Sequence, residues 1–223
     1  VTFPASRFLH ISIKNTTSYH WKFIVTSRTV NFEHFSVYLD WKDPVLTEKL
    51  KDSVCSIKSK QQKSLLISAD GFGDFASTVT AIGINNNVSI KNKILFPHSL
   101  GIFYQAFTQF LGFKNYGDEY KVMGLSAYGL DKFKKELDEV LKIKDGSFNL
   151  NLKFFQHHQK NISMQWHDEA PKFANLYSEN LNRLLKFDLE NNEITQIHMD
   201  LAKSVQIKFE EAITSYIKYY KNK

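Results

Sequence analysis

Residues 65–83 read LLISADGFGDFASTVTAIG, two apolar runs joined by a short turn that is rich in aspartate and glycine. This pattern predicts a buried strand over 65–69, a tight turn over 70–74 and a returning strand over 76–84. Acidic residues at the end of a buried strand often hold a metal ion or a phosphate-bearing ligand, and they are also ordinary hairpin residues. The apolar runs leave both interpretations open.

The turn places Asp70 and Asp74 four positions apart, with Gly71 and Gly73 between them. Carboxylate oxygens are ligands that hard and borderline cations accept. The glycines let the backbone approach a ligand, and exposed N–H groups there can meet a phosphate. Taken alone the turn is a weak signal, because plain hairpins use the same residues.

Composition limits the class of protein. The chain has 223 residues, of which 43% are hydrophobic, and this is enough for a real core. Its one cysteine, Cys55, allows no internal disulfide and no cysteine-based zinc cluster, and it fits a reducing compartment. The formal charge is +6, but the lysines alternate with acids, so we expect a solvated surface and no nucleic-acid partner. We find no signal peptide and no run near the ~20 apolar residues of a membrane span, so we expect no membrane contact and a cytoplasmic location.

Helical spacing of the apolar residues begins after the strands. Ser99 can cap a helix that Gly112 ends, and Asp118 can cap a second helix that ends near Gly129. A third helix is expected over 131–143. Strands followed by helices predict an α/β domain whose later part is helical.

The remaining chain carries three further expectations. Residues 148–154 are predicted to be extended, and Pro171 is placed where the first turn of a helix accepts proline, with apolar residues at helical spacing as far as Leu185. The stripe from Ile194 to Tyr220 predicts a long last helix, and its apolar face needs a partner surface. If that face is exposed, the chain should be poorly soluble or oligomeric.

Several polar residues outside the turn are candidates for a site. The hydroxyl of Ser99 and free N–H groups at a helix start can bind an anion, although ordinary capping explains the same residue. Gly124 inside a helix costs ~1 kcal/mol relative to alanine, which suggests close packing or a ligand against the backbone. Glu119 and Lys121 lie two positions apart, so they face different ways and one of them is expected to point into a site. The adjacent histidines 157–158 diverge and have no third ligand at a useful spacing.

Taken together, ordered blocks of the sequence resemble one family. The blocks are DGFGD, HSLGIFYQAFTQFLGF, GDEYKVMGLSAYG, FNLNLKFFQHH and ITQIHMDLAKSVQIKFEE. In this order they resemble the O-carbamoyltransferases of nodulation-factor and antibiotic biosynthesis, over about residues 64–215. The resemblance implies a ribonuclease-H-like, actin- and hexokinase-like ATPase fold, present here as its first half plus a helical insertion. Residues 63–223 would be part of the N-terminal domain of that family, and residues 1–62 a divergent segment of uncertain assignment.

The resemblance also implies chemistry. Family members use ATP as co-substrate and carbamoyl phosphate as donor, form a carbamoyl-adenylate, and transfer the carbamoyl group to a hydroxyl of a sugar or another small molecule, with a divalent metal of the iron type. By matched motif, Asp70 corresponds to the acidic residue near the metal and the carbamoyl group, and Lys121 is the better candidate for contact with an anion. The candidate catalytic residues are therefore Asp70 and Lys121, with Asp70 also a metal ligand. The candidate ligand-binding residues are Gly71, Gly73, Asp74, Ser99, Glu119 and Gly124.

This chain also departs from the family pattern. Members carry an HxxxH metal pair shortly before the acidic turn, and residues 49–63 contain no histidine. The glycine-rich nucleotide loop and the domain that activates carbamoyl phosphate are not found either. We therefore expect this chain to act together with the missing remainder of the enzyme chain, as its partner. Two alternatives stay open. One is a catalytically dead relative that binds a partner through an unpaired last helix, and the other is a phosphotransferase that resembles sugar and acetate kinases.

Overall fold

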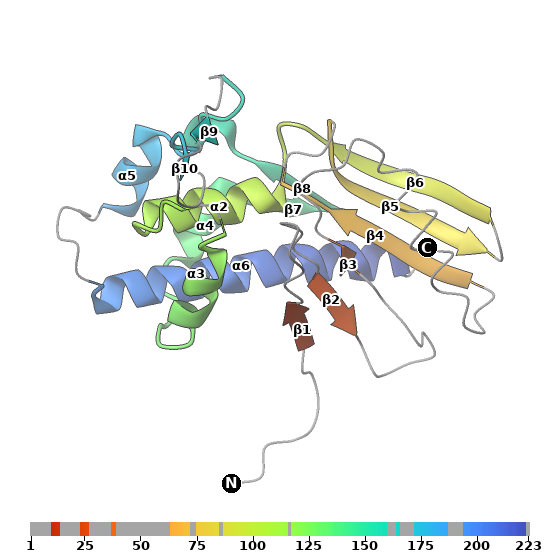
Figure 1. Cartoon of the computed structure of the whole chain (residues 1–223), viewed down its shortest axis with the longest axis horizontal. Coiled ribbons are helices and arrows are strands. Elements are labelled where there is room, and N and C mark those ends of the chain that lie inside the picture. The colour runs from red at the N-terminus through yellow and green to blue at the C-terminus, as the bar shows by residue number, and fades with distance from the viewer. Residues whose placement is uncertain are drawn as a thin grey trace, which may run out of the picture. The chain divides into compact units, whose positions relative to one another are not determined.

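The computed structural model describes residues 10–13, 23–26, 37–38, 63–71, 75–84, 87–115, 117–159, 164–165, 172–186 and 194–221. The chain divides into two compact units, Val1–Ser99 and Leu100–Lys223, and each is described by itself. Figure 1 shows strands in the first unit and mainly helices in the second, as the order of sequence patterns predicted. The family-based boundary between residues 62 and 63 stays a prediction.

Strands make up the regular structure of the described part of the first unit. They are β1 (His10–Ile13), β2 (Phe23–Thr26), β3 (Val37–Tyr38), β4 (Lys63–Ala69), β5 (Ala76–Ile84) and β6 (Asn87–Leu95). The last four form one sheet in the order β3-β4-β5-β6, with β3 parallel to β4 and the other neighbours antiparallel. β1 and β2 form a separate antiparallel pair. The strands predicted over 65–69 and 76–84 are confirmed at β4 and β5, and the turn predicted between them includes residues 72–74, which lie outside the described residues.

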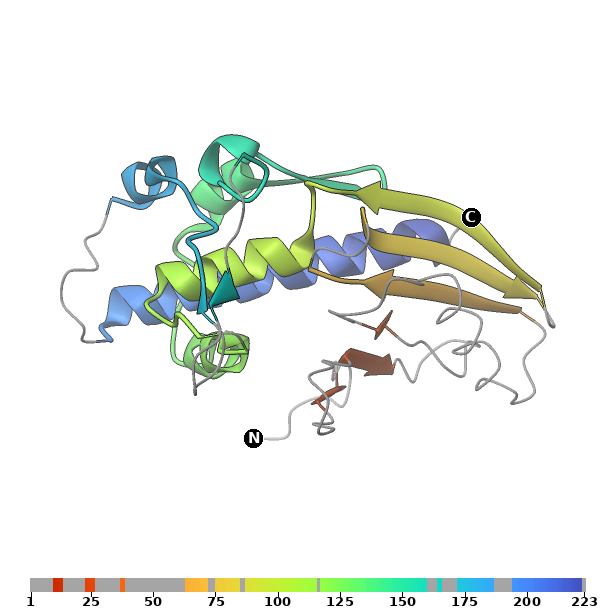
Figure 2. The same cartoon turned by 45° about the horizontal axis from the view of Figure 1, so that its top comes forward.

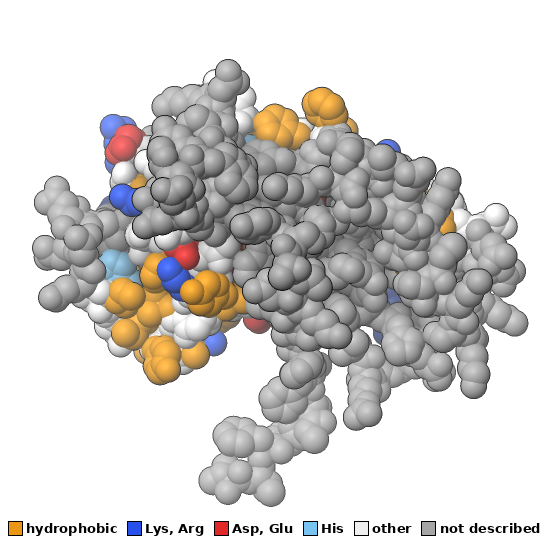
Figure 3. Space-filling view, viewed as in Figure 1, with side chains coloured by type: hydrophobic (Ala, Val, Ile, Leu, Met, Phe, Trp, Pro, Cys, Tyr) orange, Lys and Arg blue, Asp and Glu red, His pale blue; other side chains and the backbone are white. Residues whose placement is uncertain are grey.

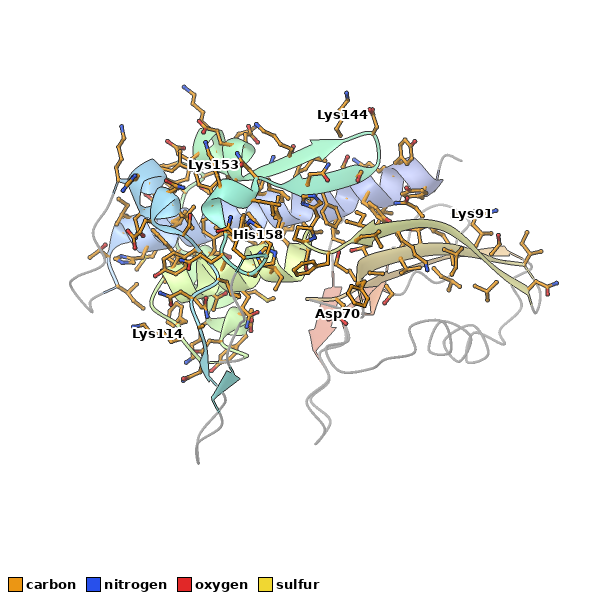
Figure 4. The ribbon with its side chains drawn as sticks, turned by 90° about the horizontal axis from the view of Figure 1, so that it is seen from above. Asp70, Lys91, Lys114, Lys144, Lys153 and His158 are labelled. Atoms are coloured by element: carbon orange, nitrogen blue, oxygen red, sulfur yellow. The ribbon has the colours of Figure 1, made fainter. Side chains whose placement is uncertain are left out.

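The apolar residues that predicted β4 and β5 also hold the sheet together. Leu66 on β4 is paired with Ala81 on β5, and both are buried in a cluster with Val79. On β6, at the edge of the described sheet, Lys91 (Figure 4) is exposed. Lys93, two positions further along β6, is exposed as well. Lysines on an edge strand disfavour pairing with another chain, because they would bring charge into the new ladder.

The described helices all lie in the second unit. Its elements are α2 (Leu100–Phe110), α3 (Glu119–Ser126), α4 (Lys134–Val140), β7 (Leu141–Lys144), β8 (Ser147–Leu150), a 3-10 turn (Leu152–Phe154), β9 (Met164–Gln165), β10 (Lys172–Phe173), α5 (Glu179–Leu185) and α6 (Gln196–Lys221). Figures 1 and 2 show α6 running alongside α2. The predicted stop of α2 at Gly112 is confirmed. Gly112 has φ +89°, its N–H donates to Gln109, and the next N–H donates to Thr108, which closes the helix end in a Schellman motif.

The apolar face of α6 is covered from Leu201 onward, and Ile197 at its start is exposed. Leu201, Val205 and Ile213 are buried, and α6 packs against α2, α3, α4, β7 and β8. The ring of Tyr216 lies 5.9 Å from that of Phe148. The long helix was predicted correctly, but the expectation that its stripe lacks a partner is wrong from Leu201 onward, because the preceding helices and the β7–β8 hairpin fold back onto it. The alternative of a dead relative that binds a partner through an unpaired α6 therefore loses most of its structural basis, and poor solubility or oligomerisation stays a prediction.

Two predicted elements differ from the structure. The helix expected over 131–143 is limited to α4, because the chain turns into the hairpin β7–β8. Asp145 and Gly146 have φ of +49° and +67°, so they supply the two left-handed positions that a tight hairpin turn needs. As a result only the first part of the predicted extended stretch 148–154 is strand, and its end forms the 3-10 turn.

The helix expected to begin at Pro171 starts later. Pro171 lies outside the described residues, but Lys172–Phe173 form strand β10 and the helix α5 begins at Glu179. The segment before α5 is instead held by a side chain. Gln109 on α2 accepts the N–H of Leu176 at 2.8 Å and donates to the carbonyl of Ala174 at 3.3 Å. The amide of Gln109 thus takes the place of a backbone partner, and the apolar spacing in this segment does not reflect a helix.

Candidate functional site

Asp70 follows the last residue of β4 and is buried, with 6% of its surface exposed. Its main chain is bound on both sides. The Asp70 N–H donates to the carbonyl of Ser77 at 2.7 Å, and the Ser99 hydroxyl donates to the carbonyl of Asp70 at 2.9 Å. The carboxylate accepts the N–H of Gly71, which is also buried. The end of β4, the start of β5 and the segment after β6 therefore fix the position of Asp70 (Figure 4).

A second serine ties the same frame together. The hydroxyl of Ser77 on β5 donates to the carbonyl of His98 and lies 3.3 Å from the carbonyl of Ile94. The Phe96 N–H donates to the carbonyl of Phe75 at 2.9 Å. Burial lowers the pKa of His98. Both serine hydroxyls therefore donate to main-chain carbonyl groups and hold the backbone in place. A side chain on such a rigid frame keeps its geometry when a ligand binds.

Three of the candidates in the first unit, Asp70, Gly71 and Ser99, lie together. The other two, Gly73 and Asp74, lie outside the described residues. Within the part of the chain that the structure describes, no group of three or more His, Cys, Asp or Glu side chains could hold a metal ion. Asp70 supplies one carboxylate, and the nearby hydroxyl protons of Ser77 and Ser99 are used on carbonyls. The described residues by themselves do not fit a metal centre.

The other candidates lie in the second unit, at the start of α3. Asp118 precedes this helix as predicted, but its side chain makes no cap hydrogen bond. One oxygen of Asp118 accepts the N–H of Asn115 at 3.2 Å, and the other lies 2.8 Å from Nζ of Lys121. The hydrogen bond to Asp118 raises the pKa of Lys121, so this ammonium group is held in its charged form. About a third of the Lys121 side chain stays exposed to an anion.

Glu119 is half-buried, and burial is the main reason that its pKa is raised to about 7. Hydrogen bonds from the N–H groups of Glu119 and Gly117 act in the opposite direction, and the charge of Asp118 adds to the increase. A carboxyl group with a pKa near neutrality can give or take a proton in that pH range.

A chain of polar groups joins two helices of the same unit. Tyr104 on α2 donates to Oε1 of Gln206 on α6 at 2.7 Å, and Nε2 of Gln206 donates to Glu210 at 2.7 Å. Burial, together with the charges of Glu119 and Glu210, raises the pKa of Tyr104 far above its ordinary value. Sequence reasoning did not find Tyr104, Gln206 or Glu210. The only local signal was the four-residue spacing of Gln206 and Glu210 on one helix face.

Gly124, in the middle of α3, is not packed. It is exposed, and a Cβ added there would have no atom within 4 Å apart from its chain neighbours and the backbone of its own helix. The expectation of close packing against Gly124 is therefore wrong for this chain. The tightly packed glycine is Gly129, after α3, where a Cβ would lie 1.9 Å from the carbonyl oxygen of Met199.

Asp200 on α6 fixes the segment that follows α3. Its carboxylate accepts the N–H of Leu130 at 2.9 Å and Nε2 of Gln196 at 2.8 Å, and it pairs with Nζ of Lys132 at 2.6 Å. These three donors, Lys132 first, lower the pKa of Asp200 to about 2. Sequence reasoning missed this residue, because two of its three partners, Leu130 and Lys132, lie some 70 positions earlier in the chain.

The candidate residues thus form two groups, one in each unit. Asp70, Gly71 and Ser99 are brought together at the end of the sheet, and Glu119, Lys121 and Gly124 share helix α3. The rings of His157 and His158 contact each other, with centroids 5.7 Å apart. No helix in the described ranges combines the length and the apolar character that crossing a membrane requires.

The sequence blocks and the mixed α/β architecture agree with one class of protein. The family model of the carbamoyltransferase N-terminus matches residues 55–222. The chain belongs to the carbamoyltransferase family and carries part of its N-terminal region, as the resemblance predicted. At the level of the family this supports a transferase.

Individual relatives include proteins of nodulation. The chain is 35% identical over 153 residues to an uncharacterized protein of Synechocystis, covering 68% of this chain and 23% of that protein. It is 36% identical over 95 residues to nodulation protein NolO of Bradyrhizobium diazoefficiens, covering 41% of this chain and 17% of NolO. It is 43% identical over 70 residues to nodulation protein NolNO of Sinorhizobium fredii, covering 30% of this chain and 10% of NolNO. The chain therefore spans less than a quarter of the length of these curated relatives.

Proposed function

We propose that this chain carries part of an enzyme that transfers a carbamoyl group from carbamoyl phosphate, through an ATP-derived carbamoyl-adenylate, to a hydroxyl of a sugar or another small molecule. The observation that carries the proposal is the match of the carbamoyltransferase N-terminus over residues 55–222. The named relatives are nodulation proteins, which agrees with a small biosynthetic acceptor.

The proposal includes the actin-like ATPase fold. An antiparallel run of three strands, β4–β5–β6, with an acidic residue at the end of β4, is compatible with the first half of such a domain. In that fold the candidate acidic turn would face the nucleotide and the carbamoyl group. The order of the elements and the family match support the proposal of this fold.

The reaction balances in three steps. Water releases phosphate from carbamoyl phosphate and leaves carbamate. A carbamate oxygen then attacks the α-phosphorus of ATP, a P–O bond forms and pyrophosphate leaves. Finally the acceptor oxygen attacks the carbamoyl carbon, the bond from that carbon to the AMP oxygen breaks, and the acceptor proton passes to a base. ATP therefore ends as AMP, whereas a kinase converts ATP to ADP.

Within this scheme we assign roles to the described candidates. Asp70, whose main chain is fixed at the end of β4, would orient the carbamoyl group. Lys121 offers a held positive charge to a phosphate oxygen. The carboxyl of Glu119, whose pKa of about 7 lets it exchange a proton near neutrality, is the candidate base for the acceptor. An iron-type divalent metal stays part of the proposal, with Asp70 as its one candidate ligand among the described residues. The three reaction steps above balance without a metal ion.

The product of ATP tests this function. The protein at the full length in which the cell makes it is incubated with α-labelled ATP, with and without carbamoyl phosphate, and the nucleotides are separated. We expect AMP and pyrophosphate only when carbamoyl phosphate is present, and transfer of labelled carbamoyl groups to polyol acceptors. ADP formed without carbamoyl phosphate would instead establish the phosphotransferase alternative. No turnover of either kind would favour the catalytically dead relative.

A further inference from the structure

Exposed hydrophobic side chains gather at the end of the sheet that carries Asp70. The described part of the first unit exposes five large hydrophobic residues, and three of them lie around the first residue of β5. We call these three residues, Phe75, Leu95 and Phe96, the apolar rim. Leu95 is paired with Ala76, and the Phe96 N–H donates to the carbonyl of Phe75 at 2.9 Å. Figure 3 shows hydrophobic side chains at the upper edge of the view, where Figure 1 draws the end of β6.

Phe75 combines two features that cost free energy. It is 80% exposed, more than any other large hydrophobic residue in the described part of the chain. Its φ is +87°, a left-handed value that glycine adopts without strain and a bulky residue rarely adopts. Burial of the phenyl ring therefore does not compensate for the strained backbone. Strained positions of this kind are common where a protein holds a ligand.

The apolar rim and Asp70 are held by one set of hydrogen bonds. The Asp70 N–H donates to the carbonyl of Ser77 at 2.7 Å. Phe75 precedes Ser77 by two residues, which span no more than about 7 Å of extended chain. The hydroxyl of Ser77 donates to the carbonyl of His98, two residues after Phe96. A buried carboxylate and an exposed aromatic side chain are therefore kept close to each other on a fixed backbone.

We propose that Phe75 binds the acceptor of the carbamoyl group as a cyclic sugar, an assignment that rests on the carbamoyl transfer proposed above. The apolar face of a pyranose ring stacks on the phenyl ring, and one of its hydroxyls is directed to the carbamoyl group at Asp70. A pyranose carries C–H groups on its faces and hydroxyls around its edge. The electron-rich face of an aromatic ring attracts such C–H groups, which bear a partial positive charge. The rim and the carboxylate thus match the two kinds of surface of one sugar ring.

The short separation of Phe75 and Asp70 along the chain favours the acceptor over the base of ATP. In a carbamoyl-adenylate, the phosphate and the ribose stand between adenine and the carbamoyl carbon, so the base lies far from the group that Asp70 would orient. The attacking oxygen of the acceptor, in contrast, must come into contact with that carbon. The size of the rim also favours a small ligand, because a stable interface with another protein uses roughly 20–30 residues on each side.

Binding and turnover of simple sugars test the proposal, with the protein at the full length in which the cell makes it. The probes are the methyl pyranosides of glucose, mannose and galactose, and the open-chain polyol sorbitol. Saturation-transfer NMR, which needs no turnover, should show transfer to ring C–H protons of at least one pyranoside and much weaker transfer to sorbitol.

Substitutions at Phe75 separate the aromatic face from mere apolar character. Phe75→Leu should lose the saturation transfer and raise the KM for the pyranoside roughly 10-fold, with the KM values for ATP and carbamoyl phosphate unchanged. Phe75→Tyr keeps the aromatic face and should behave like the wild type. Ile90→Ala, which removes an exposed apolar side chain elsewhere on β6, is the matched control and should change neither readout.

Phe75→Gly distinguishes a binding role from a structural role. Glycine relieves the left-handed strain, so the thermal midpoint should be no lower than that of the wild type while pyranoside binding is lost. A lower midpoint would make Phe75 a structural residue and overturn the proposal. So would a wild type that binds none of the three pyranosides or binds sorbitol equally well, or pyranoside binding that Phe75→Leu leaves intact.

The nucleotide readout separates this proposal from the proposed function. A raised KM for ATP in Phe75→Leu, with the KM for the pyranoside unchanged, would assign the ring to adenine and overturn the acceptor role. Absence of carbamoyl-phosphate-dependent AMP formation by the wild type would refute the carbamoyl transfer, and with it the role of the sugar as acceptor. The NMR measurement would then still decide whether a sugar ring stacks on Phe75.

Discussion

Asp70 and Asp200 are both buried aspartates, and their neighbours hold them in opposite ways. At Asp70, Ser77 and Ser99 bind the main-chain N–H and carbonyl on either side of the side chain. At Asp200, three donors from Leu130, Gln196 and Lys132 converge on the carboxylate itself. The fold in the first region therefore depends on the backbone of an aspartate, and the fold in the second region depends on its charge. The same substitution should have opposite consequences at the two positions.

The largest effect is expected for Asp70→Asn. We predict that carbamoyl-phosphate-dependent AMP formation falls at least on the order of 100-fold, because the charge that orients the carbamoyl group is lost. The thermal midpoint should change little, since both main-chain hydrogen bonds of Asp70 stay in place. Asp145→Asn, in the exposed turn between β7 and β8, is the matched control and should retain activity. Wild-type turnover by Asp70→Asn would remove Asp70 from the site.

The next effect concerns the packing of the segment that Asp200 holds. Gly129→Ala places a Cβ 1.9 Å from the carbonyl oxygen of Met199, and backbone cannot move aside as a flexible side chain can. We predict a loss of about 1–3 kcal/mol in the free energy of unfolding, measured by urea denaturation. Gly124→Ala, five residues earlier and in open space, should instead stabilise the chain by roughly 0.5–1 kcal/mol. Equal responses of the two glycines would show that α3 and α6 do not pack as described.

The pH dependence of stability tests the charge of Asp200 directly. Its pKa is about 2 in the folded chain, below the ordinary value of 3.8, so the folded state binds this proton less readily than the unfolded state. The stability that the carboxylate contributes is present in full above pH 3.8 and is lost as the pH falls toward 2.

We therefore predict that Asp200→Asn is less stable than the wild type at pH 6 and that the difference shrinks below pH 3.8. Urea denaturation between pH 2 and 6 measures it. Asp131→Asn, an exposed acid in the same segment, should follow the wild-type curve. A constant difference between wild type and Asp200→Asn over this range would mean that the carboxylate charge does not hold the segment.

Local signals explain which parts of the fold were predictable. The strands β4 and β5, the stop of α2 at Gly112 and the long helix α6 each follow from apolar spacing and a breaker residue within a few positions. The hairpin β7–β8 carried an equally local signal in Asp145-Gly146, which the apolar spacing over 131–143 obscured. The segment before α5 was misassigned because Gln109, more than 60 positions earlier, supplies its hydrogen bonds.

The candidate site was predictable only in part, for the same physical reason. The position of Asp70 at a strand end follows from the sequence, but the two serines that fix its main chain come from separate segments. Lys121 was expected to face away from Glu119, and the structure pairs it with Asp118. The burial that shifts the pKa of Glu119, and the group around Tyr104 and Glu210, depend on packing between helices that are distant in sequence.

The smallest effect is expected at Glu119, where a charge is disfavoured rather than held. Its pKa of about 7 in the folded chain lies above the ordinary 4.5, so the folded state keeps a proton that the unfolded state loses between these values. Stability therefore falls as the pH rises from 4.5 to 7 and stays reduced above that.

Glu119→Gln removes the penalty, so it should match the wild type at pH 4 and exceed it at pH 8 by on the order of 1 kcal/mol, a figure that allows for partial exposure. Glu139→Gln, on an exposed position of α4, should show no such divergence. If Glu119→Gln gains stability equally at both pH values, side-chain packing and not the charge would be the cause, and Glu119 would lose its place as the group that exchanges a proton near neutrality.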